Sequence, residues 1–87
     1  MLRIHRSEDV EVVFTLSGRV DQEAVAELKT LMRSESKRRP IVLDLRDLTL
    51  ADEDAVTFFV CCEAKSITLK NCPAYVREWI NAQRREG

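Results

Sequence analysis

The N-terminal part of the chain alternates between apolar and polar positions, which is the pattern of half-buried strands. The alternation appears first in LRIHR (2–6), stops at the turn residues SED (7–9), and restarts in VEVVFTLSG (10–18). The apolar residues of the second stretch share one face: Val10, Val12, Phe14 and Leu16. The two stretches therefore predict an antiparallel β-hairpin whose second strand ends at Gly18.

The following segment, DQEAVAELKTLMRSESK (21–37), changes to the helical period of about 3.6 residues. Asp21 can cap this helix, because its side chain can accept a hydrogen bond from a free backbone N–H of the first turn. The apolar residues form one stripe along it: Ala24, Val25, Leu28, Leu31 and Met32. We expect a helix here whose stripe faces the core.

The second half of the chain reads as strand, helix, strand and helix. Pro40 opens the β-branched run IVLDL (41–45), which is typical of a strand covered on at least one face. A helix is expected over about 53–64, a short strand over ITL (67–69), and a last helix with Pro73 in its first turn. The predicted buried side of that last helix is Val76, Trp79 and Ile80.

The predicted order is β-β-α-β-α-β-α, an α/β fold. Right-handed crossovers place the first two helices on one face of a mixed four-stranded sheet, with the hairpin as its antiparallel edge. The chain has 87 residues without repeats, linkers or low-complexity segments, so we expect one domain over 1–87. Arg3, Arg6 and Glu11 disfavour pairing through the hairpin edge, and the sequence leaves the oligomeric state open.

Charge and hydropathy exclude several partners. The formal net charge is −1, and the short basic clusters KRRP (37–40) and RR (84–85) lie at expected element ends, so we predict no nucleic-acid binding. The N-terminus lacks the apolar region of a secretory signal, and no apolar stretch approaches the roughly 20 residues of a membrane span. Three cysteines fit a reducing compartment. We therefore expect a cytoplasmic protein without membrane insertion, although a peripheral role at a membrane complex stays open.

The candidate chemistry is sparse. Cys61 and Cys62 are adjacent and the single histidine, His5, is remote, so a metal or redox site is disfavoured and buried thiols are expected. The chain has only two glycines, which excludes a Gly-rich phosphate loop. Acidic residues could gather at the carboxyl end of a strand: Asp44, Asp47, Asp52, Glu53 and Asp54. Without a nucleophile–base pair they predict no enzyme and no cofactor.

The stretch DLTLADEDAVTFFVCC (47–62) is the most informative part of the sequence. Asp52 can cap the following helix, and Glu53 and Asp54 in its first turn complement the helix dipole. The run AVTFFVCC (55–62) is more apolar than a helix packed on one side requires. Either neighbouring helices cover both flanks, or an exposed Phe58 or Phe59 adds an apolar strip to the acids as a docking patch.

Three stretches resemble the STAS domain, named for sulfate transporters and anti-sigma-factor antagonists. They are LSGRVDQEAVAELKTLM (16–32), IVLDLRDLTLADEDAV (41–56) and ITLKNCPAYVREWI (67–80). In antagonists of that family the central block continues as Asp, two serines, Gly and Leu. The corresponding residues here are Asp52, then Glu53 and Asp54 at the serines, Ala55 and Val56. A partner kinase phosphorylates the second serine, so the resemblance implies that Asp54 occupies the regulated position without being phosphorylatable.

The resemblance implies a non-catalytic regulatory domain that docks an anti-sigma factor or a regulatory kinase. The expected contact residues are Asp52, Glu53, Asp54, Ala55, Thr57 and Phe58. Because phosphoserine carries about −1.5 to −2 charges, Asp54 imitates it only in part. The domain is either locked in a phosphorylated-like state or, as the loss of both hydroxyls favours, binds its partner constitutively. Two alternatives stay open: an accessory subunit bound to the ATPase of an ATP-binding-cassette lipid transporter, and a nucleotide- or lipid-binding module.

Overall fold

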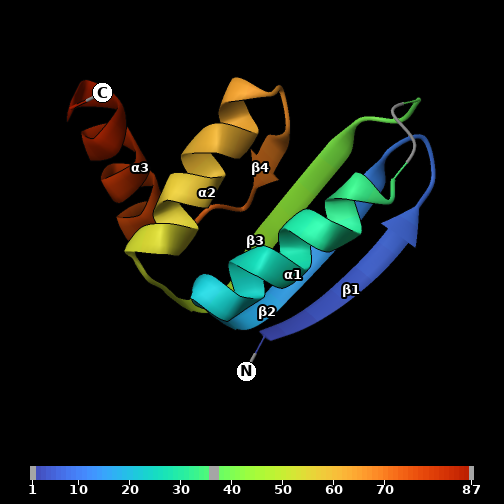
Figure 1. Cartoon of the computed structure of the whole chain (residues 1–87), viewed down its shortest axis with the longest axis horizontal. Helices are drawn as coiled ribbons and strands as arrows, with labels where there is room; N and C mark the ends of the chain where they lie inside the picture. Colours follow the sequence, from blue (N-terminus) through green and yellow to red (C-terminus); the bar gives the residue numbers. More distant parts are fainter. Residues whose placement is uncertain (1, 36–37, 87) are drawn as a thin grey trace.

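The computed structural model of the chain describes residues 2–35 and 38–86. The elements follow in the order β1 (Leu2–Glu8), β2 (Val12–Val20), α1 (Gln22–Arg33), β3 (Ile41–Ala51), α2 (Glu53–Ala64), β4 (Thr68–Lys70) and α3 (Ala74–Glu86). The four strands form one sheet in the order β1-β2-β3-β4 (Figure 1). β1 and β2 pair antiparallel, and the other two pairs are parallel. The predicted element order and mixed sheet are confirmed.

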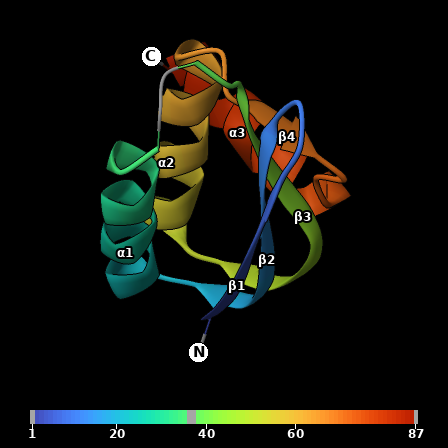
Figure 2. The same ribbon diagram turned by 90° about the vertical axis from the view of Figure 1, so that its right-hand side faces the viewer.

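The helices form a layer beside the sheet. Helix α1 connects β2 to β3, helix α2 connects β3 to β4, and both lie on the same face of the sheet (Figure 2). Both begin at the same end of the molecule, so they run side by side in the same direction (Figures 1 and 2). Helix α3 packs against α2 on the side away from α1, which leaves α2 between two helices (Figure 1).

The core lies between the sheet and this helical layer. Strand β2 alternates as predicted, with Val12, Phe14 and Leu16 buried and the residues between them partly exposed. The largest fully buried side chains come from strands and helices alike: Phe14, Phe59, Leu16, Leu28, Leu43, Leu45, Ile80, Val20, Val56 and Val76. Helix α2 contributes buried residues to several flanks because α1, α3 and the sheet all pack against it.

The hairpin turn differs from its prediction. Strand β1 continues to Glu8, which pairs with Val12, so the turn is residues 9–11 instead of 7–9. The Asp9 N–H donates to the Glu11 carbonyl oxygen at 3.0 Å and closes this turn. Val10, predicted to face the core, lies at the tip and is 82% exposed. The prediction was wrong because the strand pairing, which alternation alone does not define, decides where the chain reverses.

Strands β2 and β3 also extend beyond their predicted ends. β2 continues past Gly18 to Val20, and β3 continues past residue 45 to Ala51. Two register shifts between these strands interrupt the simple alternation that the prediction used. β4 begins at Thr68, one residue late, because the Ile67 N–H donates to the Cys62 carbonyl oxygen at the end of α2.

Two predicted core residues lie at the margins of their helices. Leu31 is 36% exposed and Trp79 is 38% exposed, so the prediction that both face the core was wrong. Of the predicted buried side of α3, Val76 and Ile80 are fully buried. Trp79 lies beside them on the helix surface, and Tyr75 one turn earlier is exposed as well.

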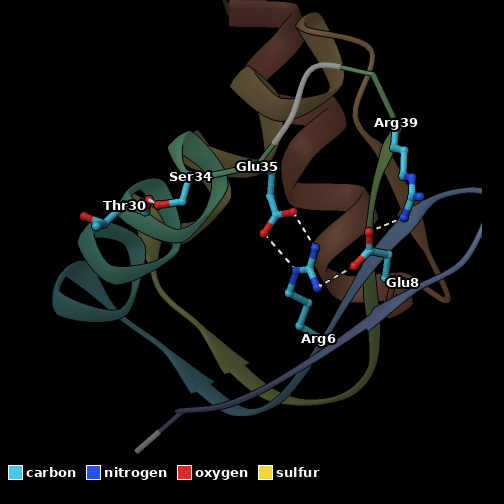
Figure 3. Close-up of polar contacts among 6 residues, drawn as sticks. All are labelled: Arg6, Glu8, Thr30, Ser34, Glu35 and Arg39. Atoms are coloured by element: carbon cyan, nitrogen blue, oxygen red, sulfur yellow. Dashed lines mark hydrogen bonds and ion pairs between the residues drawn. The ribbon is translucent and has the colours of Figure 1, made fainter.

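A charged network joins the edge strand β1 to the segment after α1 (Figure 3). The Arg6 guanidinium donates two hydrogen bonds to the Glu35 carboxylate, at 2.8 and 2.7 Å, and one to Glu8 at 3.1 Å. Arg39 also pairs with Glu8. The side chains of Arg6, Glu8 and Arg39 are 41–44% exposed, so the pairs with Glu8 contribute little stability, whereas the Glu35 side chain is only 12% exposed. The network links Glu35, just after the end of α1, to the edge strand β1.

Candidate functional site

The first acid of the triplet is part of the fold. Asp52 has extended backbone geometry, and its Oδ1 accepts a hydrogen bond from the Ala55 N–H at 2.9 Å. Its own N–H donates to the Val20 carbonyl oxygen at 3.2 Å, which ties the start of α2 to the end of β2. The predicted N-cap is confirmed, and the partly buried Asp52 side chain is committed to it.

The other two acids point to solvent. Glu53 and Asp54 occupy the first turn of α2, and both are exposed. Across residues 2–35 and 38–86, neither carboxylate has a hydrogen-bonding or ion-pair partner among the side chains. They stabilise α2 only through its dipole. The triplet therefore divides into one structural residue and two accessible negative charges.

The apolar run after the triplet is buried. Ala55 and Phe59 are fully buried, and Phe58 is only 6% exposed. The two phenyl rings pack with their centroids 5.8 Å apart. Since α1 and α3 cover both flanks of α2, no exposed phenylalanine joins the acids to form the hypothesised mixed patch. Thr57 is exposed, and its Oγ1 hydrogen-bonds to Gln83 Oε1 of α3 at 3.1 Å.

A groove of about 780 Å³ runs between α1 and α2, beginning at the acidic turn. Its apolar lining includes Val25, Met32, Phe58, Cys62 and Ile67. Asp54 and Thr57 lie on its wall, together with three cations: Lys29, Arg33 and Lys65. The sequence analysis missed the contribution of α1. The available signal was the apolar stripe of α1 followed by basic residues toward its end, but that signal does not reveal which helix lies alongside.

At the other flank of α2, Glu63 holds α3 in place. Its carboxylate accepts two hydrogen bonds from Arg77, at 2.8 and 3.0 Å, and one from Arg84 at 2.9 Å. The bonds from Arg77 outweigh burial and lower the pKa of Glu63. The negative charge of Glu63 is therefore balanced by the arginines of α3, so it does not add to the exposed acidic surface at the start of α2.

The five carboxylates that could have formed a catalytic cluster lie in two places: Asp44 and exposed Asp47 along β3, and the three consecutive acids at the start of α2. Asp44 is buried in the middle of β3, about 26 Å of extended chain from Asp52. It accepts hydrogen bonds from the Arg46 N–H at 3.0 Å and from the Asn71 side-chain amide at 3.2 Å. Burial opposes ionisation of Asp44, but these bonds and nearby cations prevail and lower its pKa. Within the described residues, no three His, Cys, Asp or Glu side chains form a group that could hold a metal ion.

The three cysteines are free thiols with different surroundings. Cys62 is buried, and burial raises its pKa to about 12. Cys72 is partly buried, and its pKa is also raised by burial. Cys61 is exposed, so the prediction of buried thiols was wrong for this residue because it lies on the side of α2 that faces the groove.

No helix in the described parts of the chain has both the length and the apolar character needed to span a membrane. No protein-family model and no curated protein sequence matches the chain. Among solved structures, the anti-sigma factor antagonist SpoIIAA in its unphosphorylated form is similar, with a TM-score of 0.64 and 17% identity. That similarity covers 93% of this chain and 82% of SpoIIAA. The chain has a STAS-like fold.

Two further structures share this STAS-like fold. An uncharacterised DUF3478-family protein from Shewanella loihica PV-4 with a SpoIIAA-like fold has a TM-score of 0.51 and 18% identity, over 75% of this chain and 56% of its own. Part of Mglu matches with a TM-score of 0.58 and 18% identity, over 83% of this chain but only 19% of Mglu. At these identities the likeness establishes the arrangement of strands and helices and leaves the function to the residues of this chain.

Proposed function

We propose that this STAS-like domain is a non-catalytic cytoplasmic regulator that docks a partner protein through the turn at Asp52–Asp54 and the first turns of α2. The partner class is an anti-sigma factor or a regulatory kinase. Two observations support the proposal: the fold is similar to that of SpoIIAA, an anti-sigma factor antagonist, and the turn presents exposed acids. Glu53, Asp54 and Thr57 supply accessible side chains, while Asp52, Ala55 and Phe58 hold them in place.

The observation that carries the proposal is the unequal use of the triplet. Asp52 alone makes the cap hydrogen bond, so the fold does not require the Asp54 carboxylate. A charge that interacts with the helix dipole but makes no hydrogen bond or ion pair in the described residues is available to a partner. The charge at Asp54 does not depend on a kinase, so binding is constitutive and is not switched by phosphorylation at this position.

The dispersed carboxylates support a role without catalysis. Acid–base chemistry needs two titratable groups close together in a cleft, with separated pKa values. Here the carboxylate of Asp44 is held ionised by the hydrogen bonds that it accepts. The carboxylate of Glu63 is paired with arginines of α3. The remaining exposed acids at the start of α2 form a charged surface for binding.

The test is affinity capture from a lysate of the source cells, with wild type beside Asp54→Arg. Glu78→Arg is the matched control, since Glu78 is an exposed acid on α3. Circular dichroism and urea unfolding establish that both variants fold. We expect one specific protein to be captured by wild type and Glu78→Arg but lost with Asp54→Arg.

The identity of the captured protein discriminates between functions. An anti-sigma factor or a kinase supports the proposal, whereas a transporter ATPase favours an accessory subunit of a lipid-transport complex. If Asp54→Arg captures the same proteins as wild type with equal yield, then Asp54 only complements the helix dipole and the docking proposal fails.

A further inference from the structure

The groove between α1 and α2 has two differently charged ends. Both helices begin at the same end of the molecule (Figure 2), so the groove has one N-terminal and one C-terminal end. Asp54, in the first turn of α2, lies at the N-terminal end. Arg33, in the last turn of α1, and Lys65, directly after α2, lie at the C-terminal end. At the C-terminal end the two full positive charges exceed the roughly half negative charge of each helix terminus, and at the N-terminal end the Asp54 charge offsets the roughly half positive charges of the two helix starts.

The length of the groove corresponds to a short helix. Helices α1 and α2 each have 12 residues. At 1.5 Å per residue this gives a trough about 18 Å long, or roughly three helical turns. Val25 and Phe58 line this trough but are only 7% and 6% exposed, so half-buried Met32 and Ile67 supply more accessible apolar surface. Three turns of a docked helix present apolar anchors at positions i, i+3 or i+4, and i+7.

We propose that this groove binds an amphipathic helix of a partner protein, oriented antiparallel to α1 and α2. The inference rests on the proposed function and adds the shape and direction of the ligand. Stable helices carry acids in the first turn and bases in the last turn. Laid antiparallel, such a helix places its acids beside Arg33 and Lys65 and its bases beside Asp54. In the parallel orientation it brings like charges together at both ends.

An acyl chain fits these observations less well. A fatty acid has a single charged end, so it could use the cations but would leave its tail beside the Asp54 carboxylate. Ligand sites for such molecules bury most of the ligand surface, whereas this groove is an open trough between two helices. An amphipathic helix buries only one of its faces. It also carries charged side chains that can pair with the cations at one end of the groove and with Asp54 at the other.

The orientation can be tested with a displayed library of 18-residue helices. All members carry the same apolar stripe, and the solvent-facing positions of the first and last turns are randomised between Glu and Lys. Selection on the full chain is expected to enrich Glu in the first turn and Lys in the last. Enrichment of the opposite polarity, or of neither, overturns the proposal.

Two variants locate the binding. Ala26 is exposed and lines the groove, so Ala26→Trp fills it without disturbing the core; Ala64→Trp, at an exposed position of α2 outside the groove lining, is the matched control. We expect selected helices to bind Ala26→Trp at least about tenfold more weakly and Ala64→Trp unchanged. Lys65→Glu is expected to weaken binding about two- to fivefold and to improve binding of the charge-swapped helix by a similar factor.

Fluorescence anisotropy of labelled helices measures these affinities, and palmitate is tested as a competitor in the same assay. If the selected helices bind Ala26→Trp and wild type with equal affinity, the proposal that the groove binds them is wrong. It is also wrong if palmitate binds and no helix is enriched. The proposed function is tested separately by the captured protein. If a partner is lost with Asp54→Arg but retained by Ala26→Trp, the result supports docking at the turn Asp52–Asp54. The same result contradicts binding of a partner helix in the groove.

Discussion

Replacement of Glu63 by glutamine tests how α3 is held against the rest of the domain. Glu63→Gln keeps the size of the side chain and removes its charge. In the native protein the carboxylate accepts two hydrogen bonds from Arg77 and one from Arg84. A neutral amide can accept at one atom only, so the paired geometry with Arg77 is lost.

The size of the effect follows from exposure. Hydrogen bonds to a charged group contribute about 1.5–3 kcal/mol when shielded, while exposed ion pairs contribute about 0–1 kcal/mol. The Glu63 side chain is 18% exposed, and those of Arg77 and Arg84 are 35% and 47% exposed, so solvent screens part of the interaction. We expect Glu63→Gln to lower the free energy of unfolding by about 1–2 kcal/mol at pH 7.

Urea unfolding as a function of pH provides the assay. The folded-state pKa of Glu63 is lowered from 4.5, so its stabilisation is present above that value and is lost as pH falls through the folded pKa. The difference between wild type and variant should therefore be constant near neutrality and shrink in acid. Glu78→Gln, at an exposed position of α3, is the control and should leave the stability unchanged.

Two outcomes would refute this reasoning. A Glu63→Gln effect at pH 7 within the roughly 0.5 kcal/mol typical of surface substitutions would mean that the arginine contacts are screened completely. A difference that persists undiminished in acid would mean that the glutamine disturbs packing and that the charge of Glu63 is irrelevant.

Three further predictions concern the cap of α2, the glycine within β2 and the cysteines of α2. Asp52→Ala removes the cap bond to the Ala55 N–H and should lower the free energy of unfolding by about 1 kcal/mol in urea, while Asp52→Asn retains most of it. Gly18→Ala should cost about 1–2 kcal/mol in the same assay, since Gly18 has φ 104°. Ellman's reagent should label exposed Cys61 rapidly in the native protein but Cys62, whose pKa burial raises to about 12, only on unfolding; equal rates would contradict that burial.

The helix starts were predictable because their determinants are local. Asp21 and Asp52 accept hydrogen bonds from backbone N–H groups three residues ahead, and those contacts need no tertiary information. Strand ends depend on a partner strand. The sequence pattern placed the hairpin turn at 7–9 instead of 9–11, which is why Val10 was assigned to the core although it lies in solvent.

The candidate site was predictable only in part. The acidic turn is contiguous in the sequence, so Glu53 and Asp54 could be identified as candidates, and the structure shows that they are exposed. The groove combines side chains of α1 and α2 that are far apart in the chain. Lys29 and Arg33 acquire meaning only when the crossovers place the two helices side by side.

The division of the triplet shows which of its side chains the start of α2 requires. The backbone of the α2 start is fixed by Asp52, through its cap bond and its link to Val20. Asp54 contributes no bond to that geometry, so serine or aspartate at this position is compatible with the same fold. Asp54→Ser should therefore unfold at nearly the same urea concentration as wild type, with at most the small loss of a helix-dipole interaction, about 0.3–1 kcal/mol. If it is instead strongly destabilised, the carboxylate is structural, and its charge cannot have been free to serve a partner.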